Sequence, residues 1–258
     1  AKVCDLAVRV GLFQAAQRKT FDRKSVESKH SHDYVSYVDR ESEKTIVAEL
    51  RAILPEAGFI TEEKTTDSDA SDAPYTWVVD PLDGTTNFIH DLGPWCVCIG
   101  LRYLGLPVLG VVYEVTRGEL FYASHGCGAW MRTADGMVKQ IHVSTTADLD
   151  QALIAVGYPY NADGFRHLAT RLCHRLYGHC ASLRSLGSAE TELCYIAAGR
   201  LEAYVESYLS PWDVCAGAAI LIEAGGKISD YSDTDLLWPS GREVLATNSL
   251  IHNAMLAE

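Results

Sequence analysis

The chain has 258 residues, of which 48% are hydrophobic and 22% are charged, and its formal net charge is −12. These values are ordinary for a globular protein with a sizeable core, and the negative charge argues against non-specific binding to nucleic acid or to an anionic membrane. No apolar run approaches the roughly 20 residues needed to span a bilayer, and no secretory signal is visible, so we expect a cytoplasmic protein.

The first predicted element is a helix over residues 3–18. Its apolar positions recur at helical spacing and are expected to form one buried face: Val3, Leu6, Ala7, Val10, Phe13 and Ala16. The polar stretch ESKHSHD that follows is expected to be a loop. The segment DRESEKTIVAELRAIL predicts an amphipathic helix with Ile46, Leu50 and Ile53 inward, and with Asp39 or its neighbour as N-cap. TTDSDASDAP is typical of a mobile surface loop.

The segment WVVDPLDGTTNF, residues 77–88, changes character abruptly after its apolar start. Residues 76–79 read as an interior strand that ends in Asp80, and Pro81 is expected to direct the chain out of the sheet. Gly84 permits a ligand to approach the backbone, and a helical turn beginning at Thr85 would offer free N–H groups. Acids and free N–H groups attract ligands of opposite charge, so their proximity needs an explanation. A divalent cation would provide it: the acids would bind the cation, and the cation and the N–H groups would together bind a phosphate. An ordinary turn is the alternative interpretation.

The sequence after residue 90 predicts alternating blocks of strands and helices. Apolar runs predict strands at 95–101, 107–114 and 119–123, with a hairpin turn at 116–118, and a later strand at 202–206. Helices are expected at 163–176, at 188–198, in the buried segment DVCAGAAILIEAGG closed by Gly225, and at the end of the chain after the strand EVLATN. This order favours a layered α/β or α+β fold, with a weak boundary near residues 143–150.

The eight cysteines are read as reduced thiols, because most lie in apolar segments of a long chain. One cluster, CHRLYGHC, contains four residue types that bind zinc: Cys173, His174, His179 and Cys180. Its pairs are adjacent in sequence, whereas structural zinc sites separate paired cysteines by about two to four residues. We therefore favour packing roles over a zinc site.

Three further acids follow apolar segments in a similar way. Glu62 and Glu63 come directly after Ile60 and Thr61, and Asp213 follows Trp212 at the start of a predicted helix. A solvated pair and a helix N-cap are the ordinary alternatives for these acids.

Three segments that contain these acids, taken in chain order, resemble the motifs of a known protein family. GFITEE, DPLDGTTNF and PWDVCAGAAILIEAGG resemble the sequence signatures of the inositol monophosphatase family, in the lithium-sensitive, magnesium-dependent phosphatase superfamily. The resemblance covers nearly the whole chain and extends to DYVSYVD and GSAETELCYIAAGRLEAYVE. It implies an αβαβα sandwich, two or three Mg²⁺ ions per active site, and a homodimer. Residues 1–145 would form a half carrying most metal ligands, and residues 146–258 a half carrying Asp213 and the substrate pocket.

The resemblance also implies roles for individual residues. The first metal would be held by Glu62, Asp80 and the carbonyl of Leu82, and the second by Asp80, Asp83 and Asp213, which suits the preference of magnesium for oxygen ligands. The phosphate would rest on the amides of Gly84 and Thr85. The attacking water would be oriented by Glu62 and Thr85, with Asp39 paired to the Thr85 hydroxyl. The family's substrate contacts match Asp83, Gly84, Thr85, Gly187, Ser188, Ala189, Glu206 and Asp213.

The chain departs from the family pattern at three places. Thr61 stands where the family usually has glycine, which would alter the loop carrying Glu62. Ser36 keeps the hydroxyl of the family's VTxxD motif, and Lys29 lies one residue closer to Asp39 than expected. None of these departures removes a ligand.

The substrate is the least determined part of this reading. Glu206 matches a family residue that contacts ring hydroxyls, which favours an inositol or sugar monophosphate, although an edge-strand carboxylate is the ordinary alternative. Relatives acting on 3'-phosphoadenosine 5'-phosphate, fructose 1,6-bisphosphate or histidinol phosphate remain open, because the fold does not separate them. A catalytically silent regulator that binds metal and phosphate is a further alternative. A P-loop enzyme is disfavoured because the G-x-x-x-x-G-K-[ST] motif is absent.

Overall fold

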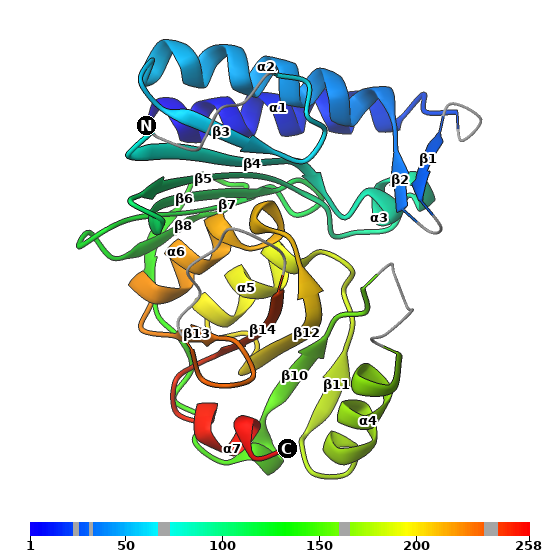
Figure 1. Cartoon of the computed structure of the whole chain (residues 1–258), viewed down its shortest axis with the longest axis vertical. Helices are drawn as coiled ribbons and strands as arrows, with labels where there is room; N and C mark the ends of the chain where they lie inside the picture. Colours follow the sequence, from blue (N-terminus) through cyan, green and yellow to red (C-terminus); the bar gives the residue numbers. More distant parts are fainter. Residues whose placement is uncertain (23–25, 31–32, 67–72, 160–165, 235–241) are drawn as a thin grey trace.

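The computed structural model describes residues 1–22, 26–30, 33–66, 73–159, 166–234 and 242–258. These residues form five layers, in which two sheets alternate with three pairs of helices (Figure 1). The predicted αβαβα sandwich is therefore confirmed. Within the described residues, no helix combines the length and the apolar character that crossing a membrane requires.

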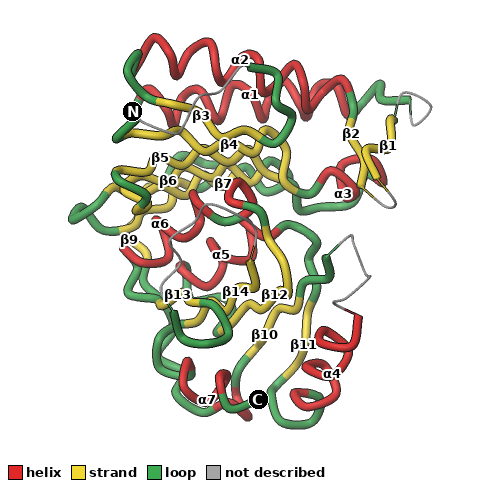
Figure 2. The backbone as a smooth tube through the Cα atoms, in the orientation of Figure 1, coloured by secondary structure: helices red, strands yellow, loops and turns green. Residues whose placement is uncertain are grey.

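The outer layers are α1 with α2 on one side and α4 with α7 on the other, while α5 and α6 lie between the sheets (Figure 2). The helices span Lys2–Arg18 (α1), Tyr37–Ile53 (α2), Thr85–His90 (α3), Arg166–Leu176 (α4), Ala189–Ala197 (α5), Cys215–Glu223 (α6) and His252–Leu256 (α7). The predicted helices are thus confirmed, that at 163–176 over its described part. Two 3₁₀ turns, η2 and η3, cover Leu149–Gln151 and Pro211–Asp213.

The first sheet has seven strands in the order β3-β4-β5-β6-β7-β8-β9. Its strands are Gly58–Thr61 (β3), Tyr75–Asp83 (β4), Cys96–Tyr103 (β5), Leu106–Glu114 (β6), Glu119–Ser124 (β7), Ala129–Arg132 (β8) and Val138–Ile141 (β9). Only β3 and β4 run parallel, so both reach the same edge of the sheet with their carboxyl ends. The predicted strands at 95–101, 107–114 and 119–123 are confirmed as β5, β6 and β7.

The second sheet has five strands in the order β11-β10-β12-β14-β13. They span Leu153–Val156 (β10), Ser182–Arg184 (β11), Ala203–Leu209 (β12), Lys227–Ser229 (β13) and Arg242–Thr247 (β14). Because β12 lies at the centre, Glu206 is not the edge-strand carboxylate that was one of its two interpretations. β1 (Glu27–His30) pairs with β2 (Asp33–Val35), so the described residues of ESKHSHD lie in a small antiparallel ribbon, and the expected loop is wrong for them.

The buried face of α1 differs from the predicted one at its C-terminal end. Phe13 is 37% exposed and Ala16 is exposed, whereas Gln14 is fully buried. A helix advances 3.6 residues per turn, so position 14 continues the line of positions 3, 7 and 10. The Gln14 amide donates to the carbonyl of Pro81 at 2.7 Å, which pins α1 to β4 near its end.

β4 continues past the point at which the chain was expected to leave the sheet. Asp80 pairs with Cys98 and Asp83 with Cys96, so three steps along β4 match two steps along β5. This is a β-bulge with one extra residue, at a position where proline cannot donate to the ladder. The expectation that Pro81 ends the strand was therefore wrong, because a bulge leaves a residue unpaired and so tolerates a proline, which has no N–H group to donate.

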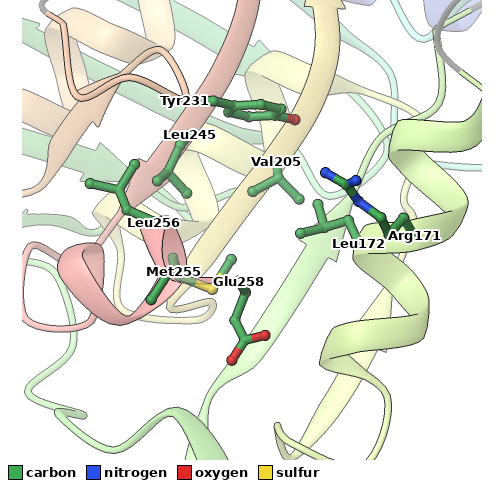
Figure 3. Close-up of a pocket in the computed structure, with 9 residues that line it drawn as sticks. Arg171, Leu172, Val205, Tyr231, Leu245, Met255, Leu256 and Glu258 are labelled. Carbon is green, nitrogen blue, oxygen red and sulfur yellow. The ribbon is translucent and has the colours of Figure 1, made fainter.

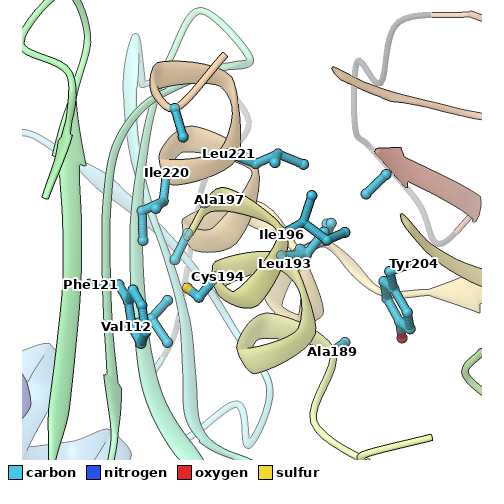
Figure 4. Close-up of a cluster of buried hydrophobic side chains, with 14 of the residues drawn as sticks. Val112, Phe121, Ala189, Leu193, Cys194, Ile196, Ala197, Tyr204, Ile220 and Leu221 are labelled. Atoms are coloured by element: carbon cyan, nitrogen blue, oxygen red, sulfur yellow. The ribbon is translucent and has the colours of Figure 1, made fainter. Parts of the chain in front are cut away.

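One hydrophobic cluster joins the two sheets through the central helices. Val112 and Phe121 of the first sheet meet Ile196 of α5 and Ile220 of α6 (Figure 4). The contact between α6 and β6 is very close, because a Cβ at Gly110 would collide with the carbonyl oxygen of Ala216. Glycine at position 110 thus lets the start of α6 lie directly on the sheet that carries β4.

Candidate active site

Four acids lie near one another, where β3 and β4 end and where the 3₁₀ turn η3 precedes α6. Glu62 follows β3, Asp80 and Asp83 belong to β4, and Asp213 closes η3, which contacts both strands. Burial raises the pKa of Asp80 well above its usual value, and repulsion by Glu62, Asp83 and Asp213 adds to the shift. Burial followed by repulsion from Glu62 and Asp83 raises the pKa of Asp213 in the same way. The cluster is therefore a concentrated source of negative charge that favours a cation.

The bulge in β4 explains why Asp80 and Asp83 cooperate although they are three residues apart. In a regular strand, side chains three apart point to opposite faces. Their partners Cys98 and Cys96 are two apart, so the bulge returns both acids to one face. Asp80 Oδ1 also accepts a hydrogen bond from the Leu82 amide at 2.9 Å, which fixes the carboxylate over the bulge.

Glu62 is held in place by backbone contacts on both sides. Thr61 is the last residue of β3 and pairs with Val79, and the Glu62 amide donates to the Val79 carbonyl at 3.2 Å. Thr61, which was expected to alter the loop carrying Glu62, is itself a buried residue of β3 and not part of a loop. The next turn is fixed by Glu43 of α2, whose carboxylate accepts from the amides of Glu63 and Thr65 at 2.7 Å each.

Asp39 and Thr85 form a buried pair beside the acids. The Thr85 hydroxyl lies 3.1 Å from Asp39 Oδ1 and 3.0 Å from the Leu82 carbonyl oxygen, and its single proton goes to one of them. The N-cap of α2 is Ser36, and Asp39 closes the capping box by accepting from the Ser36 amide and hydroxyl. Asp39 is therefore the third residue of the helix and not its N-cap. Burial raises its pKa, which these hydrogen bonds oppose.

The turn into α3 confirms the predicted helical start at Thr85. Gly84 has φ of 91°, in the left-handed region, and α3 begins at Thr85. A Cβ at Gly84 would approach the Pro94 carbonyl oxygen to 2.9 Å, so the close packing itself excludes a side chain. The Asn87 amide joins this turn to the 186–188 segment by donating to the Pro94 and Leu186 carbonyls at 2.8 and 2.7 Å.

Asp83 is held by residues from the opposite half of the chain. Its Oδ2 accepts from the Ser188 hydroxyl at 2.7 Å and from the Glu190 amide at 2.9 Å. The Cys96 thiol also approaches this oxygen, at 3.5 Å. Asp83, Cys96 and Cys98 are close enough to share an ion, but burial raises the pKa of both thiols, which keeps them neutral and unsuited to metal binding. We interpret these thiols as neighbours that pack against and orient Asp83.

Asp213 begins no helix of its own. Its Oδ2 accepts from the Ser210 amide at 2.7 Å within the capping box of η3, while the N-cap of α6 is Val214, which has no side-chain acceptor. The N-cap interpretation of Asp213 for the long helix was therefore wrong.

Glu206 lies on β12, near the side chains of Tyr204 and Glu192. The Tyr204 hydroxyl donates to Glu206 Oε2, which confirms that both side chains share one face of the strand. Gly157 provides the space, since a Cβ there would overlap this carboxylate. Burial raises the pKa of Glu206 to about 7 and that of the nearby Glu192 to about 8.

A cavity of about 240 Å³ lies against β12, which contributes Val205 and not Glu206 to its lining (Figure 3). Val205 of β12, Leu172 of α4 and Met255 of α7 line it, with Arg171 and Glu258 beside them. None of the predicted site residues contributes to it. Nor do Cys173, His174, His179 and Cys180 form a group of converging ligand atoms among the residues described; the Cys173 thiol instead contacts the Tyr158 hydroxyl at 3.3 Å.

The structure places Asp83 of the first half beside Ser188 and Glu190 of the second, while the carboxylate oxygens of Glu62, Asp80, Asp83 and Asp213 do not form a compact ligand group among the residues described. It also adds two acids that the sequence did not reveal. Glu43 and Glu190 are both fully buried. The only sequence signal for Glu43 is its position on the inward face of α2, in line with Ile46 and Leu50. The side chain of Lys29 lies outside the described part of the chain, as do residues 67–72 of the predicted surface loop.

Comparison with known proteins agrees with this geometry. A family model described as the inositol monophosphatase family matches residues 3–258. The chain is 36% identical over 251 residues to the Nus factor SuhB of Escherichia coli strain K12, covering 97% of this chain and 91% of that protein. It is 34% identical over 232 residues to the inositol-1-monophosphatase of Caulobacter vibrioides, covering 90% and 89%. The crystal structure of the extragenic suppressor protein SuhB from Bartonella henselae superposes with a TM-score of 0.88 at 30% identity, covering 98% and 95%.

Proposed function

The chain belongs to the inositol monophosphatase family, and on this premise we propose that it is a magnesium-dependent phosphomonoesterase that acts on an inositol or related sugar monophosphate. The observation that carries the proposal is the group of acids around Asp80: burial and repulsion by Glu62, Asp83 and Asp213 raise the pKa of Asp80, and burial and repulsion by Glu62 and Asp83 raise the pKa of Asp213. Such a cluster is costly unless cations neutralise it.

The donor set fits magnesium. The four acids and the Leu82 carbonyl offer only oxygen, which hard cations prefer, and Gln14 and Glu43 hold the backbone on either side. We propose Glu62, Asp80 and Leu82 as ligands of one ion and Asp80, Asp83 and Asp213 as ligands of a second. When bound, such ions supply Lewis-acid stabilisation to the attacking and leaving oxygens of a phosphate ester.

The residues of the chain then have distinct tasks. The Thr85 hydroxyl, kept in place by Asp39, would orient the attacking water together with Glu62. The amides of Gly84 and Thr85 would hold the phosphate where α3 begins. Glu206 would accept hydrogen bonds from the substrate's hydroxyl groups, with Gly187, Ser188 and Ala189 along the same pocket. Most of the catalytic effect would thus come from positioning and from charge neutralisation.

Other functions give different experimental results. A phosphatase acting on 3'-phosphoadenosine 5'-phosphate, fructose 1,6-bisphosphate or histidinol phosphate would share the acids but not the dependence on Glu206. A silent regulator is the second candidate, because the relative from Escherichia coli is called a Nus factor and not an enzyme. The retained set of Glu62, Asp80, Asp83, Thr85 and Asp213 favours the enzyme. We also propose a homodimer and a cytoplasmic location, on the family resemblance alone.

The test is a phosphate-release screen over inositol, sugar and nucleotide phosphates, with magnesium and with excess chelator. We expect release from inositol phosphate that requires magnesium, is inhibited by lithium and is lost in Asp80→Asn. Turnover that persists in chelator would refute the metal-dependent mechanism. Folded protein that binds magnesium but releases phosphate from none of these compounds would favour the regulator.

A further inference from the structure

We infer that Glu190 is a positioning residue that fixes Asp83 and Asp213 relative to each other, and thereby sets the affinity of the cation position that these two acids share. The inference rests on the proposed function, because it assumes that both acids bind a cation. It concerns a residue to which the resemblance assigned no role, outside the three signature segments and within the similar segment GSAETELCYIAAGRLEAYVE.

The side chain of Glu190 secures the start of α6. Its carboxylate accepts hydrogen bonds from the amide of Ala216, at 3.0 Å, and from the amide of Gly217. The first amides of a helix have no partner within the helix, and the N-cap Val214 has no side-chain acceptor to offer. Glu190 therefore performs the capping of α6 from a different helix, and an acid at this end also suits the helix dipole.

Gly217 is shaped for this contact. A Cβ at position 217 would lie 2.5 Å from Glu190 Oε2, closer than such atoms approach in proteins. Asp213 precedes Ala216 by three residues, so the amides held by Glu190 lie in the first turn of α6, directly after the 3₁₀ turn that carries Asp213. Fixing the start of α6 therefore restrains the backbone that positions Asp213.

The backbone of the same residue holds the other acid. The Glu190 amide donates to Asp83 Oδ2 at 2.9 Å. One residue therefore contacts Asp83 of β4 through its amide and the start of α6 through its carboxylate. Because Glu190 is fully buried, it has no solvent-exposed alternative position. Partners that orient metal ligands in this way typically change metal affinity by about 10–100-fold when they are removed.

The experiment is a calorimetric titration of the substrate-free protein with Mg²⁺, comparing wild type with Glu190→Gln and Glu190→Asp. Glutamine keeps the length and loses the charge, whereas aspartate keeps the charge and is too short to reach both amides. We expect each variant to bind Mg²⁺ about tenfold or more weakly at one class of sites. If aspartate binds like wild type and only glutamine is weaker, the effect is one of charge and the positioning role is refuted.

Glu114→Gln is the matched control. Glu114 is also fully buried and also accepts from two backbone amides, those of Thr116 and Arg117 at 2.9 Å each, but in the turn between β6 and β7. We expect this variant to lower the thermal midpoint as the Glu190 variants do, without changing Mg²⁺ affinity. Equal Mg²⁺ affinities in Glu190→Gln, Glu190→Asp and Glu114→Gln would overturn the inference.

Asp80→Asn separates the inference from its premise. If Asp80→Asn loses Mg²⁺ binding while the Glu190 variants retain it, the inference fails and the proposed metal site stands. If Asp80→Asn binds Mg²⁺ like wild type, the assignment of the metal site fails, and the inference fails with it.

Discussion

Replacing Glu206 by glutamine should separate substrate recognition from chemistry. The carboxylate accepts from the Tyr204 hydroxyl, and we propose that it also accepts from substrate hydroxyl groups. A hydrogen bond to a charged group contributes about 1.5–3 kcal/mol, so kcat/KM for inositol phosphate should fall about tenfold or more. Nitrophenyl phosphate has no ring hydroxyls, and its hydrolysis should be nearly unchanged.

The pH dependence sharpens this prediction. Burial raises the pKa of Glu206 to about 7, so the charged acceptor is present above that pH and lost below it. A group of this pKa is about 3% ionised at pH 5.5 and about 90% at pH 8, so the ratio of kcat/KM values for the two substrates should rise at least about tenfold across this range. Repulsion by Asp83 contributes to the shift, so bound cations should move the midpoint somewhat lower.

Glu206→Gln should abolish the rise, because glutamine does not titrate. Tyr204→Phe should move the midpoint to higher pH, since the hydroxyl's hydrogen bond lowers the pKa of Glu206. The assay is initial-rate kinetics with both substrates at saturating magnesium, and the same ratio measured with Glu206→Gln corrects for the different ionisation of the two phosphate groups. Equal losses for both substrates in Glu206→Gln would mean that Glu206 supports the metal site or the fold, and an unchanged ratio would place the substrate elsewhere.

Three further substitutions test the acid cluster and the residues beside it. Thr85→Ala and Asp39→Asn should each lower kcat with little change in magnesium affinity, and the double variant should lose less than the product of the single losses, because the two groups act as a pair; strictly multiplicative losses would show that they are not coupled. In chelator, Asp80→Asn should raise the thermal midpoint at neutral pH. Because the pKa of Asp80 is raised in the folded state, protonation of this carboxyl stabilises the wild-type fold fully below the ordinary pKa of 3.8, and this stabilisation is lost as the pH rises. The rise in thermal midpoint caused by Asp80→Asn should therefore shrink on acidification. A midpoint that falls in chelator at neutral pH would contradict this account of repulsion.

The sequence predicted the layered fold and the helices, because apolar periodicity decides both locally. It missed the short strands β8, β9, β10 and β11, which span only three or four residues each and leave too little pattern to recognise. It also misplaced the buried face of α1, since Gln14 is polar and its partner, Pro81, lies 67 residues away. A polar residue that is buried for the sake of one distant carbonyl has no local signature.

The candidate site divides in the same way. The acids could be proposed from the sequence because they belong to motifs of the family, and the structure places them in or next to three elements, β3, β4 and η3. Glu43 and Glu190 were not predictable, because each holds backbone amides that are distant in sequence, at Glu63 and Thr65 in one case and at Ala216 and Gly217 in the other. Such contacts depend on the packing of whole elements, which the sequence specifies only through the complete fold.

The bulge in β4 makes the number of residues between Asp80 and Asp83 as important as their identity. Many segments tolerate the loss of one residue if the remaining side chains are polar or apolar in the right places. Here, deleting Leu82 would restore a regular ladder with β5 in which Asp80 and Asp83, then two residues apart, still share one face. The shortened strand would lose the amide that donates to Asp80 Oδ1 and the carbonyl oxygen that lies 3.0 Å from the Thr85 hydroxyl. The extra residue therefore serves the site through its backbone, and a change in the length of this stretch removes contacts that no substitution of the Leu82 side chain removes.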